Sequence, residues 1–191
     1  LAWAYSHKSQ LDMLAFNLDA AARWGERALD LAEKLGETEI VIHALGNVGA
    51  AQLDPVGPNS TALERSIALA REKGLHDHAE RASCNLTCTS YWRRDFPLAL
   101  QHIDDGVAYA VVRDLSHWET YLRGWRAMIY LDRGEWAEAE REAEEISGWI
   151  ATPELFRFPA FITLSRLRVR RGDIDADADI PLANARRIAG P

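Results

Sequence analysis

Residues 135–139, Glu135-Trp136-Ala137-Glu138-Ala139, carry the pattern that decides the fold of this chain: a polar residue, an apolar residue and, three positions later, a small one. The pattern stands intact at 17–21 and 95–99 and in eroded form at 55–59 and 173–177. Its apolar member falls at positions 18, 56, 96, 136 and 174, in steps of 38, 40, 40 and 38 residues. Repeats of this length are typical of arrays of helix pairs, in which each unit packs on the next because it cannot bury its apolar face alone. The spacing therefore predicts an all-α fold, a right-handed superhelix of about five helix pairs with the first helix of each pair on the concave side.

Local signals divide this single array into units. An apolar stripe at helical spacing fills 19–35, with Asn17 and Asp19 as N-cap candidates and Gly36 as the C-cap. Pro159 is expected at the start of a late helix. The predicted units are approximately 1–36, 37–75, 76–115, 116–152 and 153–191. The predicted helices cover 2–15, 19–35, 38–53, a segment from the cap Ser60 to Gly74, 77–93, 96–113, 116–132, 135–149, 159–171 and a weakly helical 179–189.

The charge balance argues against nucleic acid as a partner. The 191 residues hold 22 Lys and Arg against 29 Asp and Glu, a formal net charge of −7, so the surface should repel phosphate backbones. Basic residues concentrate only near the C-terminal end, where interaction with helix dipoles is favoured over a nucleic-acid patch. These are Arg166, Arg168, Arg170, Arg171, Arg186 and Arg187.

The chain also lacks the sequence signals of secretion or membrane insertion. No apolar run approaches the ~20 residues that span a bilayer, and no signal segment opens the chain. Two cysteines indicate cytosolic usage, so we expect a cytoplasmic protein. Because the chain begins at Leu1 within a helical pattern, we expect it to be a fragment of a longer protein.

Candidate chemistry is sparse. Cys84 and Cys88 lie on one helix face with His76, His78 and His102 within plausible reach, but a zinc site needs four converging ligands, and cysteines are good small fillers at helix contacts. No carboxylate pair stands in an apolar setting, and the chain has no nucleophile-elbow pattern or phosphate-binding loop. We therefore predict no enzymatic activity, no cofactor and no metal.

Two groups of residues carry a family resemblance. Tyr130, Gly134, Trp136 and Ala139 resemble the tetratricopeptide repeat, although the period exceeds that family's usual 34 residues. The segments WGERALDLAEKLG at 24–36 and RLRVRRGD at 166–173 are similar to the repeat region of large LuxR-type bacterial regulators that carry an AAA-like ATPase. Phe16, Asp54 and Arg94 stand where the repeat normally has glycine, which predicts that these turns differ.

The resemblance implies a role in signalling. It identifies the chain with the sensor and scaffold section of a transcriptional regulator, with the ATPase and the DNA-binding helix-turn-helix expected elsewhere in the full-length protein. The partner would then be a protein, peptide or small-molecule effector, with no direct nucleic-acid or membrane binding by this section. The alternative is a free-standing tetratricopeptide-like adaptor or self-assembling protein. A homo-oligomer is compatible with both hypotheses.

The resemblance also indicates where a ligand would bind. Transferring the groove positions of the repeat by register forms a column on the first helices, and Trp92 is added as a large amphipathic ring near its centre. Periodicity alone gives a different interpretation of one part of the column, because Trp118, Tyr121, Trp125 and Ile129 form a stripe typical of core packing. Both interpretations stay open at this point. The predicted groove residues are Trp3, His7, Arg81, Asn85, Trp92, Tyr121 and Trp125.

Overall fold

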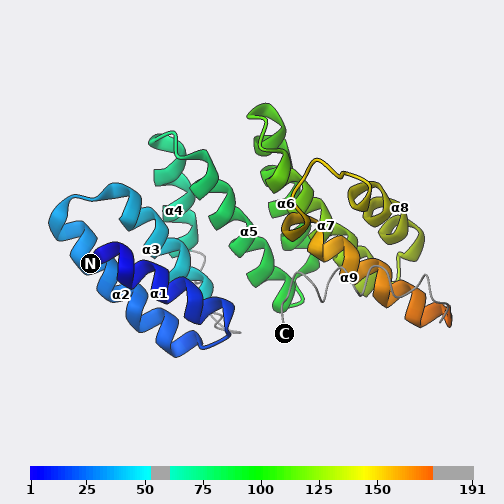
Figure 1. The fold of residues 1–191 in the computed structure, drawn as a ribbon, viewed down its shortest axis with the longest axis horizontal. Coiled ribbons are helices and arrows are strands. Elements are labelled where there is room, and N and C mark those ends of the chain that lie inside the picture. Colours follow the sequence, from blue (N-terminus) through cyan, green and yellow to red (C-terminus); the bar gives the residue numbers. More distant parts are fainter. Residues whose placement is uncertain (53–60, 174–191) are drawn as a thin grey trace. The chain divides into compact units, whose positions relative to one another are not determined.

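The computed structural model describes residues 1–52 and 61–173, and all regular structure in these residues is α-helical (Figure 1). This confirms the all-α prediction. The predicted helices before residue 150 occur within two residues of their expected bounds, whereas Ser60 and the segment 179–189 lie outside the described residues. The helices are α1 (Ala2–Leu14), α2 (Leu18–Leu35), α3 (Thr38–Ala51), α4 (Thr61–Glu72), α5 (His76–Trp92), α6 (Phe96–Val112), α7 (Ser116–Arg133), α8 (Trp136–Ser147) and α9 (Glu154–Arg171).

The helices group into two compact units, Leu1–Arg94 and Asp95–Pro191. The division falls between α5 and α6, inside the predicted repeat unit 76–115. In the described part of the chain, no helix is long and apolar enough to cross a membrane.

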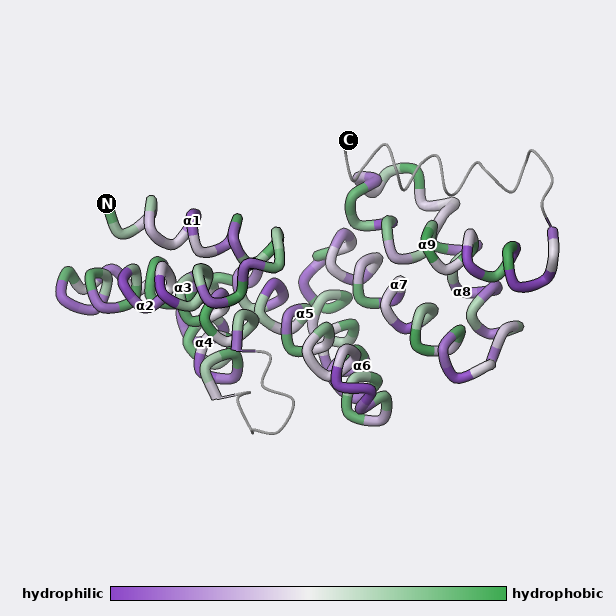
Figure 2. The backbone as a smooth tube through the Cα atoms, turned by 90° about the horizontal axis from the view of Figure 1, so that it is seen from below, coloured by the Kyte–Doolittle hydropathy of each residue, from purple (hydrophilic) through white to green (hydrophobic). Residues whose placement is uncertain are grey.

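In the first unit each helix packs on the next, and α3 also packs on both α1 and α5. This pattern sets α1, α3 and α5 side by side, with α2 and α4 packed against them. Hydrophilic and hydrophobic residues alternate around the turns of α2 (Figure 2). Its buried stripe consists of small residues spaced four, three and four positions apart, which allows close helix approach: Ala21, Gly25, Ala28 and Ala32.

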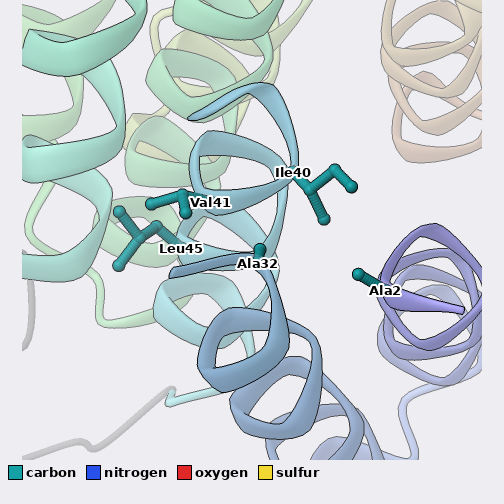
Figure 3. Close-up of a cluster of buried hydrophobic side chains, with 5 residues drawn as sticks. All are labelled: Ala2, Ala32, Ile40, Val41 and Leu45. Carbon is teal, nitrogen blue, oxygen red and sulfur yellow. The ribbon is translucent and has the colours of Figure 1, made fainter. Parts of the chain in front are cut away.

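The central helix of this unit, α3, is buried along its whole length from Ile40 to Ala51. Figure 3 shows Ile40 pointing toward Ala2 of α1, whereas Val41 and Leu45 extend on the opposite side of the helix. Because α3 has neighbours on several sides, it lacks a polar outer face, as expected for an enclosed helix.

Glycines set the closest helix contacts around α3. A Cβ atom added at Gly25 of α2 would lie 2.5 Å from Val48 Cγ2, and one added at Gly49 would lie 2.7 Å from Leu63 Cγ and 3.0 Å from Leu63 N. Side chains at these two positions would therefore push α2 and α4 away from α3.

The second unit is arranged around α7, which packs on α6, α8 and α9. The closest approach is between α7 and α9, where a Cβ added at Gly124 would lie 3.1 Å from Pro159 Cβ. The prediction that α9 begins at Pro159 is wrong, because the helix begins at Glu154 and Pro159 lies buried inside it. Proline is tolerated there because it removes only one early intrahelical hydrogen bond, and Gly124 leaves room for its ring.

Left-handed residues end most of the helices. Gly36, with a φ of 70°, confirms the predicted C-cap. The expectation that the turns at Phe16 and Arg94 differ is wrong, because these residues adopt φ values of 59° and 62°, in the same left-handed region as the glycines. A helix end needs this conformation to satisfy its last carbonyl groups, so the backbone geometry recurs even where the residue is unfavourable.

Two further turn predictions have different outcomes. Asn17 is the N-cap residue of α2, but its side chain makes no capping hydrogen bond. Asp54 lies outside the described residues.

Candidate functional site

The predicted column on the first helices has members that the sequence prediction omitted. Trp3, Arg81 and Tyr121 each precede the second member of their pair by four residues, and the same register in the second repeat unit falls on His43 and Asn47. The first members then stand at 3, 43, 81 and 121, in steps of 40, 38 and 40 residues. We call the members in the first unit the polar row: Trp3 and His7 on α1, His43 and Asn47 on α3, and Arg81 and Asn85 on α5.

Aromatic contacts join the α1 and α3 parts of the polar row. The Trp3 and His7 rings are stacked with centroids 5.2 Å apart. His43 meets Trp3 edge-on at 5.3 Å and His7 at 5.2 Å, and on its other side it meets His78 at 5.8 Å. Rings from α1, α3 and α5 are therefore in contact across the row.

Hydrogen bonds join α3 to both neighbours and fix the orientation of Asn47. Arg81 Nη1 donates to Asn47 Oδ1 at 2.9 Å, and Asn47 Nδ2 donates to the Ser6 carbonyl at 2.8 Å. A guanidinium can only donate, so the amide oxygen must face Arg81 and the amide nitrogen must face α1. Asn47 thus bridges α5 and α1 through one side chain.

The same network assigns the tautomer of His43. Asn47 Nδ2 lies 3.4 Å from His43 Nδ1, and Ser6 Oγ lies 2.6 Å from the same nitrogen. Because the amide group is a donor, Nδ1 is an acceptor and the imidazole carries its proton on Nε2. Burial lowers the pKa of His43 to about 3, and nearby Arg81, His78 and His7 lower it further, so the ring is neutral at physiological pH.

Arg81 occupies an unusual environment for a cation. Its Nη2 donates to the His43 carbonyl at 3.0 Å, and its Nε is buried without a hydrogen-bond partner. Within the described residues, no carboxylate forms an ion pair with it. Burial lowers the pKa of Arg81 to about 10, which still leaves it charged at neutral pH.

Asn85 lies one turn beyond Arg81 on α5. Its Nδ2 donates to the Gly46 carbonyl across a long 3.4 Å contact, so it is only weakly held. Trp92 is 56% exposed at the end of α5, where its ring meets Tyr91 edge-on, and it makes no described contact with the polar row.

The remaining predicted residues lie in the second unit. Tyr121 and Trp125 meet edge-on at 6.3 Å, and Tyr121 also meets Trp118 and Phe156. Trp125 is only 8% exposed, whereas Tyr121 and Trp118 are half-buried. The burial of Trp125 favours the core-packing interpretation for that residue.

Ion pairs, by contrast, neutralise many charged residues of the second unit. Buried Glu142 accepts from Arg123 Nε at 3.0 Å and from Arg126 Nε at 2.9 Å. Among the C-terminal arginines, Arg166 pairs with Asp132 at 2.7 Å and Arg171 with Glu140. Arg186 and Arg187 lie outside the described residues.

The cysteines provide no reactive centre. Burial raises the pKa of Cys84 and raises that of Cys88 to about 12, so both remain protonated thiols. In residues 1–52 and 61–173, no three His, Cys, Asp or Glu side chains are placed to hold a metal ion, and the set Cys84, Cys88, His76, His78 and His102 forms no such group.

The chain matches no protein-family model, and no curated protein matches it. The residues themselves therefore carry the functional argument. The polar row offers hydrogen-bond donors, flat rings and one incompletely partnered cation on three adjacent helices, an arrangement suited to binding.

Proposed function

We propose that this chain is a non-catalytic ligand- or protein-binding scaffold whose polar row makes the specific contacts. The observation that carries the proposal is the set of contacts that joins the row. Arg81, Asn47 and Ser6 are linked by hydrogen bonds across α5, α3 and α1, and Trp3 stacks on His7 beside them. Such preorganised polar and aromatic groups bind at a low entropic cost because their neighbours already hold them.

The proposal extends to the arrangement of the whole chain and to its biological setting. We place the polar row on the concave side of a right-handed superhelix of five tetratricopeptide-like helix pairs, because the 40, 38 and 40-residue steps extend the row to Tyr121. The segments at 24–36 and 166–173 support the sensor region of a cytoplasmic LuxR-type transcriptional regulator. A protein, peptide or small-molecule effector would then bias the ATPase and DNA-binding domains of the full-length protein.

A thermal-shift screen of metabolites and peptides tests the binding proposal. A ligand at a hundred times its dissociation constant adds about 2.7 kcal/mol to the free energy of unfolding. We expect Asn85→Ala to weaken a hit with little change in the melting temperature, since its own contact is long. Arg65→Met on α4 is the matched control, because Arg65 lies outside the row and pairs with Glu33 at 3.2 Å. Hits that are indifferent to Asn85→Ala and to Arg81→Met would contradict a site in the row.

The sequence of the full-length gene tests the regulatory setting. A phosphate-binding loop upstream and a helix-turn-helix downstream would support the regulator, whereas stop codons close to both ends would support the adaptor alternative. The net charge of −7 further predicts negligible DNA binding by this section alone at physiological salt. Salt-sensitive micromolar binding in a gel shift would contradict that expectation.

A further inference from the structure

Arg81 carries a positive charge into the packed face between α3 and α5. Its two described hydrogen bonds go to neutral acceptors, Asn47 Oδ1 and the His43 carbonyl. Arg65 in the same unit differs, because a carboxylate of Glu33 lies 3.2 Å from it. Removing a cation from water costs several kcal/mol unless an anion or a full set of acceptors replaces the solvent.

The surroundings of Arg81 share its sign. The charged groups that act on His43 are all basic, namely Arg81, His78 and His7. One carboxylate, that of Glu39, reaches the edge of this region, where its Oε1 lies 3.1 Å from His78 Nε2. The polar row is therefore locally cationic, although the chain as a whole is acidic.

We propose that Arg81 receives an oxoanion group, a carboxylate or a phosphate, of the ligand that binds the polar row. The inference deepens the proposed function and rests on it, because it names the ligand chemistry of the same site.

The hydrogen-bonding capacity of Arg81 fits this ligand. Each Nη nitrogen has two N–H groups and makes one described bond, so one N–H on each remains for a two-oxygen acceptor. The side chain is only partly buried, which leaves it open to an approaching anion. Asn85 lies one turn away, and its weakly held amide can donate to the same ligand.

Inorganic phosphate and acetate are the probes, each titrated against chloride at constant ionic strength while the melting temperature is followed. Phosphate also stabilises proteins nonspecifically, but that effect grows without saturating. We expect a saturable rise of about 4 °C at ten times the dissociation constant in the wild-type chain. Saturation with acetate alone would assign a carboxylate ligand, and saturation with phosphate alone would assign a phosphate ligand.

The variants locate the effect. Arg81→Met removes the charge and should abolish the saturable rise, whereas Arg65→Met should retain it. Retention in Arg81→Met, or the absence of a saturable rise with both anions in the wild-type chain, would overturn the inference. A neutral hit from the ligand screen that still depends on Asn85 would then leave the binding proposal standing, so the two failures are distinguishable.

A measurement on the wild-type chain avoids dependence on the folding of Arg81→Met. Phenylglyoxal condenses with arginine guanidinium groups, and peptide mapping reports the rate at each site. At ten times its dissociation constant, the effective anion should slow modification of Arg81 about tenfold by mass action. Arg65 should be modified at an unchanged rate. Equal rates at Arg81 with and without the anion would contradict the proposal.

Discussion

A methyl group on Gly46 would lie 2.9 Å from Arg81 Nη2. The missing side chain at position 46 therefore admits the guanidinium to the backbone of α3, where it reaches the His43 carbonyl. A second glycine one turn along the same helix, Gly49, instead faces Leu63 of α4. Two glycines of α3 thus serve different neighbours, one a flexible cation and the other a packed helix.

Gly46→Ala should displace Arg81 without unfolding the chain. The atom in its way is the far end of a long side chain, which can rotate, and alanine gains about 1 kcal/mol of helix propensity against a similar loss of hydrogen bonding. We expect a small change in the free energy of unfolding by urea titration, together with a loss of the saturable phosphate or acetate response.

Gly49→Ala provides the matched control. Its Cβ would meet Leu63 N, a backbone atom that cannot rotate away, at 3.0 Å. We expect a loss of about 2 kcal/mol in the free energy of unfolding and a retained anion response. Equal destabilisation by the two substitutions would contradict the difference between these contacts.

The stability of the first unit should fall on acidification because of His43. Burial holds its pKa near 3 in the folded chain, whereas an unfolded histidine has a pKa of about 6.5, so below that value the unfolded state binds more protons. This contribution is fully present above the unfolded pKa and is lost progressively as the pH falls toward 3. We expect a loss of about 2 kcal/mol between pH 7 and pH 5 by urea titration.

The comparison variant for this pH dependence is His43→Asn. The amide oxygen of asparagine can replace Nδ1 as the acceptor from Ser6 Oγ, but it does not titrate. The slope of stability against pH in this range should decrease markedly in His43→Asn. An unchanged slope would show that His43 is not the responsible group.

Sequence patterns predicted the helices but not the network that joins them. Periodicity and turn signals report which backbone positions face a neighbour, and they located the helix bounds before residue 150 to within two residues. They failed at Pro159, because its tolerance inside α9 depends on a gap at Gly124 that lies 35 positions away in the chain. Long-range packing decided that boundary.

The polar row was predicted only in part for a related reason. Register alone could have identified His43 and Asn47, since they complete the 40, 38 and 40-residue steps. Register could not show that Asn47 links Arg81 to Ser6, because that depends on the distances between three side chains or carbonyl groups in space. The burial of Trp125 was equally inaccessible, since one helical stripe fits both a core and a groove.

Phe16→Gly should stabilise the chain. Phe16 adopts a φ of 59°, which strains a residue with a Cβ, and its side chain is 68% exposed, so little packing is lost. We expect a gain of about 1 kcal/mol in the free energy of unfolding. Phe16→Ala retains the strain and should show no comparable gain. Gly36→Ala is the reverse experiment, because a Cβ there has open space, and the φ of 70° alone should cost about 1 kcal/mol.

Glu142→Gln should strongly destabilise the second unit. Glu142 is 4% exposed and holds Arg123 and Arg126 through charge-assisted hydrogen bonds of 3.0 and 2.9 Å. Removing its charge leaves two partly buried guanidinium groups without their shared anion, at a cost of about 3 kcal/mol in the free energy of unfolding. Glu140→Gln is the control, because Glu140 pairs with the exposed Arg171 and should change the urea midpoint very little. Similar midpoints for the two variants would show that burial does not set the contribution of Glu142.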